Sequence, residues 1–150
     1  MDKPLENLVV RAIRAEDADE IRRILSLITK APSEIDFKRI IGEQLRRGED
    51  ASFVAELDGK VVGYMISYII YGGYGLEKSA WIAMLGVIPK LMGEGVGKRL
   101  AEEIFRVYLE KGITNIFTSV RWDSVDLLSF FKTLGFNRSN FINLRKELQP

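Results

Sequence analysis

The pattern of apolar and polar positions predicts a chain of short strands interrupted by helices. Continuous or alternating apolar runs predict six strands, at residues 8–13, 52–57, 60–71, 80–87, 113–120 and 141–144. Apolar residues spaced three or four positions apart predict four helices, at residues 15–28, 33–47, 95–111 and 124–134. Because strands occur both consecutively and between helices, we expect a single domain over residues 1–150, with an α/β (α+β) fold in which helices cover a mixed sheet.

Residues that favour turns and helix ends indicate where several of the predicted strands and helices begin or end. Asp58-Gly59 separates two strand patterns, and this pair favours the left-handed backbone of a tight hairpin turn. The second helix is expected to open at Pro32-Ser33 and to end at Gly48, with four residues facing inward, namely Ile35, Ile40, Ile41 and Leu45. Gly135 is expected to close the last helix.

The most informative segment runs from Val87 to Leu100 and has glycines at positions 93, 95 and 97. Glycine lets a backbone turn sharply or lie close to a ligand, and amides at the start of a helix bind anions. Two familiar glycine loops do not fit. A Walker A loop needs glycine at Met92 and Ser or Thr at Arg99, and a dinucleotide fingerprint needs glycine at Lys98.

A third arrangement does fit. The segment resembles the acyl-CoA-binding segment of the GNAT superfamily of N-acetyltransferases, in which a strand ends in a Val-x-Pro-like step and a glycine loop opens a long helix. The matching residues are Val87-Ile88-Pro89 and Gly93-Glu94-Gly95-Val96-Gly97. Residues 8–28, the hairpin with Val61-Val62-Gly63-Tyr64, and residues 131–136 follow in the family's order. The resemblance therefore covers nearly the whole chain and implies a mostly antiparallel central sheet flanked by helices.

The resemblance implies acetyl-CoA as cosubstrate, with its pyrophosphate on the amides of the turn at 92–98. Backbone groups at 85–87 would pair with the pantetheine arm, and a splay between strands 80–87 and 113–120 would admit the thioester. Lys98 would add a positive charge. The CoA-binding residues expected from the resemblance are Leu85, Gly86, Val87, Met92, Gly93, Glu94, Gly95, Val96, Gly97, Lys98, Ser124 and Phe131.

Several positions depart from the family's pattern. Met92 stands where the family has Arg or Gln, and its side chain donates no hydrogen bond. Ser124 stands where many members have Asn, although it or Asp123 can also cap the following helix. Phe131 stands where many members have a Tyr that protonates the leaving thiolate, and strand 80–87 carries no acid where members often place Glu. The remaining candidates for catalysis are Glu77, Asp123 and Ser124.

Composition removes other classes of protein. The net charge of +1 implies no large basic surface, so we expect no nucleic-acid partner. The chain has no Cys and no His, which excludes thiol chemistry and removes the commonest metal ligand, so we expect no metal site. No apolar run is long enough to span a bilayer, and Met1–Pro4 opens no secretory signal, so we expect a cytoplasmic protein without a membrane partner.

The sequence therefore predicts an acetyl-CoA-dependent N-acetyltransferase that transfers acetyl directly to a primary amine. The acceptor stays open among small amines, polyamines, antibiotics, and the N-terminus or lysines of a protein. The alternative is a CoA- or acyl-CoA-binding sensor of the same fold, and a homodimer is compatible with either. Four tyrosines are candidates for core packing, an acceptor pocket or the missing phenol, namely Tyr64, Tyr68, Tyr71 and Tyr74.

Overall fold

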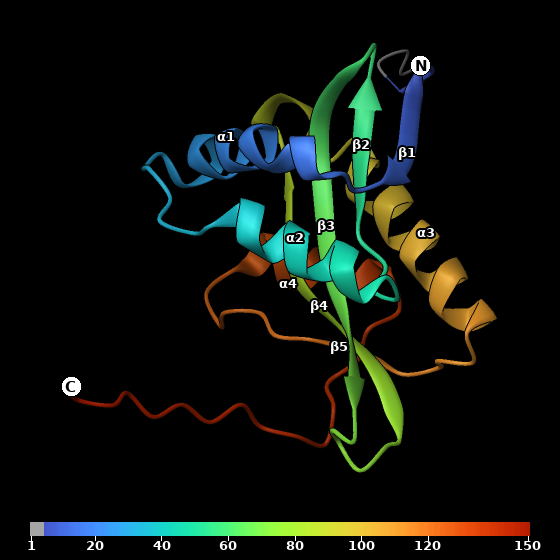
Figure 1. Cartoon of the computed structure of the whole chain (residues 1–150), viewed down its shortest axis with the longest axis vertical. Helices are drawn as coiled ribbons and strands as arrows, with labels where there is room; N and C mark the ends of the chain where they lie inside the picture. Colours follow the sequence, from blue (N-terminus) through green and yellow to red (C-terminus); the bar gives the residue numbers. More distant parts are fainter. Residues whose placement is uncertain (1–4) are drawn as a thin grey trace. The chain divides into compact units, whose positions relative to one another are not determined.

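The computed structural model describes residues 5–150 and forms two compact units, Met1–Phe117 and Thr118–Pro150 (Figure 1). The first four residues, on which the expectation about a secretory signal rests, lie outside the described residues. The first unit contains β1 (Leu8–Ala12), α1 (Ala18–Thr29), α2 (Phe37–Arg47), β2 (Phe53–Leu57), β3 (Lys60–Tyr71), β4 (Lys78–Val87) and α3 (Val96–Glu110). Short 3-10 helices occur at Ala15–Asp17 and Pro89–Leu91. Strand β5 (Ile116–Thr118) spans the boundary, and α4 (Val125–Thr133) lies in the second unit.

The strands form one sheet in the order β1-β2-β3-β4-β5, and the first three pairings are antiparallel. The predicted mixed, mostly antiparallel sheet is therefore confirmed. Two irregularities interrupt the ladders. Val62 is the extra residue of β3 opposite Ala55 and Glu56, and Ala83 is the extra residue of β4 opposite Ile66 and Ser67. Such bulges bend a strand and re-aim its side chains.

The predicted hairpin between β2 and β3 is confirmed. Leu57 pairs with Lys60, and the two turn residues Asp58 and Gly59 have φ values of 54° and 81°. Both values lie in the left-handed region that a two-residue turn needs to match the strand twist. Asp and Gly are residues that adopt this region at low cost, so a local sequence signal fixes this register.

Helices cover both faces of the sheet in the first unit (Figure 1). On one face, a Cβ at Gly63 would lie 3.0 Å from Val96 of α3, so glycine lets that helix approach β3 closely. On the other face, the Tyr64 ring packs edge-on against Phe37 of α2 at a centroid distance of 6.2 Å. Consecutive residues of a strand point to opposite faces, which explains why β3 is buried along most of its length.

A buried ion pair joins the first strand to the helix that follows it. The guanidinium of Arg11 donates to both carboxylate oxygens of Asp17 at 2.9 and 2.8 Å, and to Glu56 at 2.6 Å. The Asp17 carboxylate also accepts from the Arg14 N–H at 2.7 Å. Asp17 is only 3% exposed, so these donors replace the water that its charge loses on burial.

A buried polar cluster ties α2, β3 and α3 together, and we call Gln44, Ser52, Ser67 and Tyr108 the polar cluster. Gln44 Nε2 donates to the Ser67 carbonyl at 2.7 Å, and the Ser67 N–H donates to Ser52 Oγ at 3.1 Å. The Tyr108 hydroxyl lies 2.6 Å from Ser67 Oγ and accepts from the Ala51 N–H at 2.9 Å. Every member is buried and has at least one partner.

Several predicted element boundaries differ from the observed ones. The second helix begins at Phe37, because the Asp36 carboxylate accepts from the Arg39 N–H and caps the helix there. This start turns Phe37 and Ile41 inward, whereas Ile35 and Leu45, predicted inward, are 36% and 48% exposed. The predicted strand 113–120 is shortened to Ile116–Thr118.

The predicted strand at 141–144 is wrong. Residues 137–150 form no helix or strand, and Phe141, Ile142 and Leu144 are 53%, 85% and 91% exposed. A strand requires a neighbour for its backbone groups. In the described second unit the segment gains a side-chain contact, from Asn143 Nδ2 to Ser119 Oγ at 2.8 Å, and no ladder. The loose alternation of apolar residues was too weak a signal on its own.

Candidate functional site

The glycine turn joins the end of β4 to the start of α3. Gly93 and Gly95 have φ values of 81° and 97°, which other residues rarely adopt. Gly95 is the residue before the helix, and Gly97 already belongs to the first turn of α3 without a left-handed φ. Two of the three alternating glycines are therefore required by backbone conformation, while the third is not.

The turn leaves several backbone donors without an acceptor. Within it, the Met92 N–H donates to the Pro89 carbonyl and the Glu94 N–H to the Leu91 carbonyl, both at 3.2 Å. Five other amides donate to no acceptor in the described part of the chain, those of Gly93, Gly95, Val96, Gly97 and Lys98. The first amides of a helix never have intrahelical partners, and the helix dipole adds partial positive charge at this end. Together they form a concentrated set of donors for an anion.

Side chains around the turn add little to these backbone donors. Met92 is half exposed and donates nothing. Arg99 is directed elsewhere, because its guanidinium donates to the Leu8 carbonyl at 3.3 Å. Lys98 is exposed and forms no ion pair with any described residue, so it is a free positive charge beside the amides.

The end of β4 presents a backbone edge beside the turn. On one side, Leu85, Gly86 and Val87 pair with Met65, Tyr64 and Gly63 of β3. On the other side, the Ala80 N–H donates to the Asn115 carbonyl at 3.0 Å, near the start of the strand. The neighbouring strand on this second side is β5, and no hydrogen bond joins Leu85–Val87 to the described residues of the first unit there. This free edge is a surface to which an extended amide-containing chain can add by strand-like hydrogen bonds.

Gly86 also has a packing role. A Cβ there would lie 2.7 Å from the Tyr64 ring and 3.0 Å from Ile28 of α1. The Tyr64 ring cannot give way, because it is itself fully buried. The glycine at this position therefore brings α1 and the aromatic core up to the strand that carries the free edge.

The proposed catalytic carboxylate of the first unit, Glu77, lies in the loop before β4. Its carbonyl accepts from the Gly72 N–H at 2.9 Å, which closes the loop between β3 and β4. Its side chain is exposed and has no hydrogen bond or ion pair with another described residue. Glu77 is thus an exposed carboxylate whose side chain no described residue holds in place.

The other candidates, Asp123, Ser124 and Phe131, belong to the second unit. Arg121 donates to both oxygens of Asp123, at 3.0 and 3.1 Å, and this lowers the pKa of the Asp123 carboxyl below its ordinary value. Ser124 is the residue before α4, but its side chain makes no capping hydrogen bond. Phe131 is buried against Phe130 and Phe136, with ring centroids 5.2 and 5.0 Å away.

Comparison with known proteins shows the family of this chain. The sequence pattern of the Acetyltransferase (GNAT) family matches residues 18–136. The chain belongs to this family. It is 28% identical over 134 residues to an N-alpha-acetyltransferase of Sulfurisphaera tokodaii, covering 85% of this chain and 78% of that protein. It is 27% identical over 119 residues to N-alpha-acetyltransferase 30 of Schizosaccharomyces pombe, covering 79% and 78% of the two chains.

Solved structures share the fold of this GNAT protein. An aminoglycoside N-acetyltransferase in complex with CoA superposes with a TM-score of 0.79 at 17% identity, covering 93% of this chain and 94% of that one. At this identity the likeness shows the fold alone. It confirms the fold class expected from the sequence, and it shows that a protein of this fold binds CoA.

The four tyrosines of this GNAT protein have different surroundings. Tyr64 belongs to the core, and burial raises its pKa to about 12. Tyr68 lies 6.5 Å from the Trp81 ring and has a raised pKa, mainly because of burial. Tyr71 donates to Glu49 at 2.9 Å, and Tyr74 stacks on Phe117 at 3.9 Å. Only Tyr68 combines partial burial with a place on the face that carries Tyr64, as its even spacing predicts.

Sequence reasoning missed two features near these residues. Trp81 sits opposite Tyr68 on β4, and its buried Nε1 donates to no acceptor in the described chain. The register between β3 and β4 that pairs the two rings includes the bulge at Ala83, and no sequence signal marks that bulge. Sequence reasoning also missed a pocket beside the hairpin, lined by Leu57, Asp58 and Lys60 among others.

Proposed function

We propose that this protein is an acetyl-CoA-dependent N-acetyltransferase that transfers an acetyl group directly to a primary amine. Membership of the GNAT family supports acetyl transfer in general. The observation that carries the proposal for this chain is the set of five amides, at Gly93 and 95–98, that have no acceptor among residues 5–150. Hydrogen bonds to a charged group contribute about 1.5–3 kcal/mol each, so several converging amides suffice to hold a diphosphate without an arginine at Met92.

In this proposal the free edge of β4 positions the rest of CoA. The backbone of Leu85–Val87 pairs with the amides of the pantetheine arm, as an added strand pairs with a sheet edge. Acetyl-CoA supplies a thioester that is already activated. The contribution of this chain is then to hold thioester and amine in line, which lowers the barrier by several kcal/mol, up to about 7–11 kcal/mol in well-oriented systems.

Proton removal from the amine is assigned to solvent or to an exposed group. An amine with a pKa of about 10 is mostly protonated at neutral pH, and reaching the neutral form from about three units below costs roughly 4 kcal/mol. We propose Glu77 as the candidate base, because it is the carboxylate of the first unit nearest to β4 in sequence. Asp123 is a weak base because Arg121 stabilises its charged form, and Ser124 remains a candidate for a hydrogen bond to CoA.

The acceptor we propose is a peptide or protein α-amine, with small primary amines as the second class. The support is that two relatives are named N-alpha-acetyltransferases. A thialysine N-epsilon-acetyltransferase of Sus scrofa, 24% identical over 145 residues, supports the second class. An α-amine has a pKa of about 8, which reduces the cost of deprotonation to roughly 1–2 kcal/mol at neutral pH.

The test couples binding to turnover. CoA binding is measured by calorimetry, and release of free thiol is followed with acetyl-CoA and a panel of peptides, diamines, polyamines and aminoglycosides. We expect CoA to bind and at least one acceptor to release thiol above the rate of hydrolysis, with an acetylated amine found by mass spectrometry. Binding of CoA without acetylation of any acceptor would contradict the proposed acetyltransferase activity. Absence of CoA binding would contradict the site itself.

The alternative is a CoA-binding sensor of the same fold, and Phe131 favours it because a phenyl ring has no proton for a leaving thiolate. The variant Phe131→Tyr separates the two. A large gain in turnover at unchanged CoA affinity indicates a protein that has lost catalysis. An unchanged, measurable turnover indicates that water or another group already protonates the thiolate, as the enzyme hypothesis requires.

A further inference from the structure

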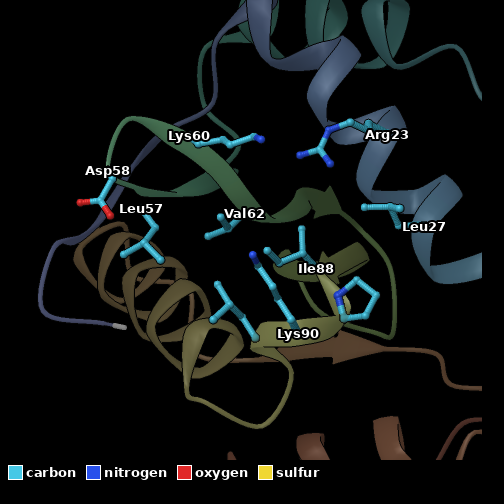
Figure 2. A pocket seen from close by; sticks show the side chains of 10 residues that line it. Arg23, Leu27, Leu57, Asp58, Lys60, Val62, Ile88 and Lys90 are labelled. Atoms are coloured by element: carbon cyan, nitrogen blue, oxygen red, sulfur yellow. The ribbon is translucent and has the colours of Figure 1, made fainter. Parts of the chain in front are cut away.

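A pocket of about 730 Å³ lies beside the hairpin of the first unit, and we call it the hairpin pocket (Figure 2). Its apolar floor is formed by one residue each of α1, of the start of β3 and of the segment after β4, namely Leu27, Val62 and Ile88. None of the turn residues 92–98 lines it. Its size falls within the range of small-molecule sites, and it is distinct from the amides assigned to CoA.

The bulge in β3 shapes this pocket. Val62 is the residue without a partner on β2, and its carbonyl accepts from the Ile88 N–H at 2.9 Å. The bulge therefore joins the two strand ends that form the apolar floor. Leu27 is 44% exposed although it is a large apolar residue of an otherwise amphipathic helix. An apolar ligand in the pocket would cover it.

Three cations surround this floor. In Figure 2 the charged ends of Arg23 and Lys60 point toward each other, and the ammonium of Lys90 points into the same space. Lys60 and Lys90 are exposed and form no ion pair with the described residues, whereas Arg23 lies 2.9 Å from Glu20. Like charges that converge repel each other, and an anion between them removes that repulsion.

The acid at the rim does not neutralise these cations. The Asp58 carboxylate accepts from Asn7 Nδ2 at 3.2 Å and points away from the three charged ends in Figure 2. The pocket therefore combines an apolar floor with an excess of positive charge at its opening. We propose that the hairpin pocket binds an organic anion with an apolar body, separate from CoA. The acid group lies between Lys60, Lys90 and Arg23, and the body lies on Leu27, Val62 and Ile88.

The test is a heteronuclear NMR titration of the full chain with butanoate, hexanoate and octanoate. We expect octanoate to shift the amide signals of Leu27, Val62 and Ile88 and to leave those of residues 93–98 unchanged. The dissociation constant should fall with chain length, by at most about fourfold for each added methylene. Octanol and acetate separate the two contributions, since one lacks the charge and the other lacks the apolar body.

Charge variants complete the test. Lys60→Met should weaken octanoate binding about threefold, and Lys60→Met with Lys90→Met about tenfold. Both lysines are exposed, so the fold is retained, and Lys38→Met on α2 is the matched control that should change nothing. Saturating CoA should not displace octanoate. Displacement by CoA, equal binding of octanol, shifts confined to another surface, or no shifts up to the solubility of octanoate would each overturn the proposal.

Discussion

Two regions of the first unit are rich in polar groups and use them in opposite ways. In the polar cluster, the Tyr108 hydroxyl, Ser67 and Gln44 are buried and each has a hydrogen-bond partner inside the protein. In the glycine turn, five amides have no acceptor in the described chain. Paired groups stabilise the fold, because leaving one unpaired costs about 1–3 kcal/mol. Unpaired amides at an exposed helix start cost less and are available to a ligand, so stability and binding should be separable by mutation.

The strongest way to break the turn is Gly95→Val. Gly95 has a φ of 97°, and a β-branched residue there is strained in any surroundings. Moving the amides of this turn removes hydrogen bonds of about 1.5–3 kcal/mol each, so we expect the dissociation constant of CoA to rise at least about a hundredfold. Calorimetric titration measures this change.

The matched control for that variant is Gly112→Val. Gly112 follows α3, has a φ of 78° and has open space around it, so its backbone strain is similar. We expect a comparable loss of thermal stability and an unchanged affinity for CoA. If both variants weaken CoA binding equally, strain in the fold and not the turn is responsible, and the site assignment is wrong.

The corresponding way to break the polar cluster is Tyr108→Phe. Removing the hydroxyl leaves the Ala51 N–H and Ser67 Oγ with fewer partners in a buried place, so we expect the free energy of unfolding to fall by about 2 kcal/mol. Urea denaturation measures it. Tyr71→Phe is the control, since that ring is 58% exposed and its loss of a bond to Glu49 should have little effect. A loss of CoA affinity in Tyr108→Phe without loss of stability would contradict the expectation that stability and CoA binding are separable by mutation.

The glycine turn was predictable because its signal is contiguous in sequence. Gly93 and Gly95 mark left-handed backbone, and the apolar spacing of Val96, Leu100 and Ile104 marks the helix that follows. The hairpin at Asp58-Gly59 was predictable for the same reason. Local conformational preferences dominate at these places, so sequence and structure agree there.

Features that depend on distant partners were not predictable. Tyr108 of α3 is fully buried, and its hydroxyl bonds to Ser67 and Ala51, which lie 41 and 57 positions away in the sequence. The start of α2 depends on the Asp36 cap, which overrides the apolar spacing of Ile35. Candidate catalytic groups are non-local in the same way, and Glu77, Asp123 and Ser124 stay predictions.

The pH dependence of acetyl transfer sharpens the comparison, because paired and buried groups should not titrate near neutrality. The Tyr64 pKa is raised to about 12, and Arg121 lowers the pKa of Asp123, so neither changes charge between about pH 6 and pH 9. We expect kcat/KM to rise tenfold per pH unit until the pKa of the amine, about 8 for a peptide α-amine. The rise has this sign because the neutral amine is the nucleophile. A loss of kcat/KM in Glu77→Gln at unchanged CoA affinity would identify Glu77 as the base.

The smallest expected effect comes from adding a donor to the turn with Met92→Arg. Met92 is 50% exposed, so a guanidinium there interacts with CoA across solvent and contributes about 0.2–1 kcal/mol, or roughly a threefold gain in affinity. The gain should shrink at high salt, because exposed charges are screened. Leu109→Arg adds the same charge at an exposed position near the other end of α3 and is the matched control. If Leu109→Arg improves CoA binding as much, net charge explains the gain. If only Met92→Arg does, the backbone amides hold the phosphates at the place where this side chain can reach them.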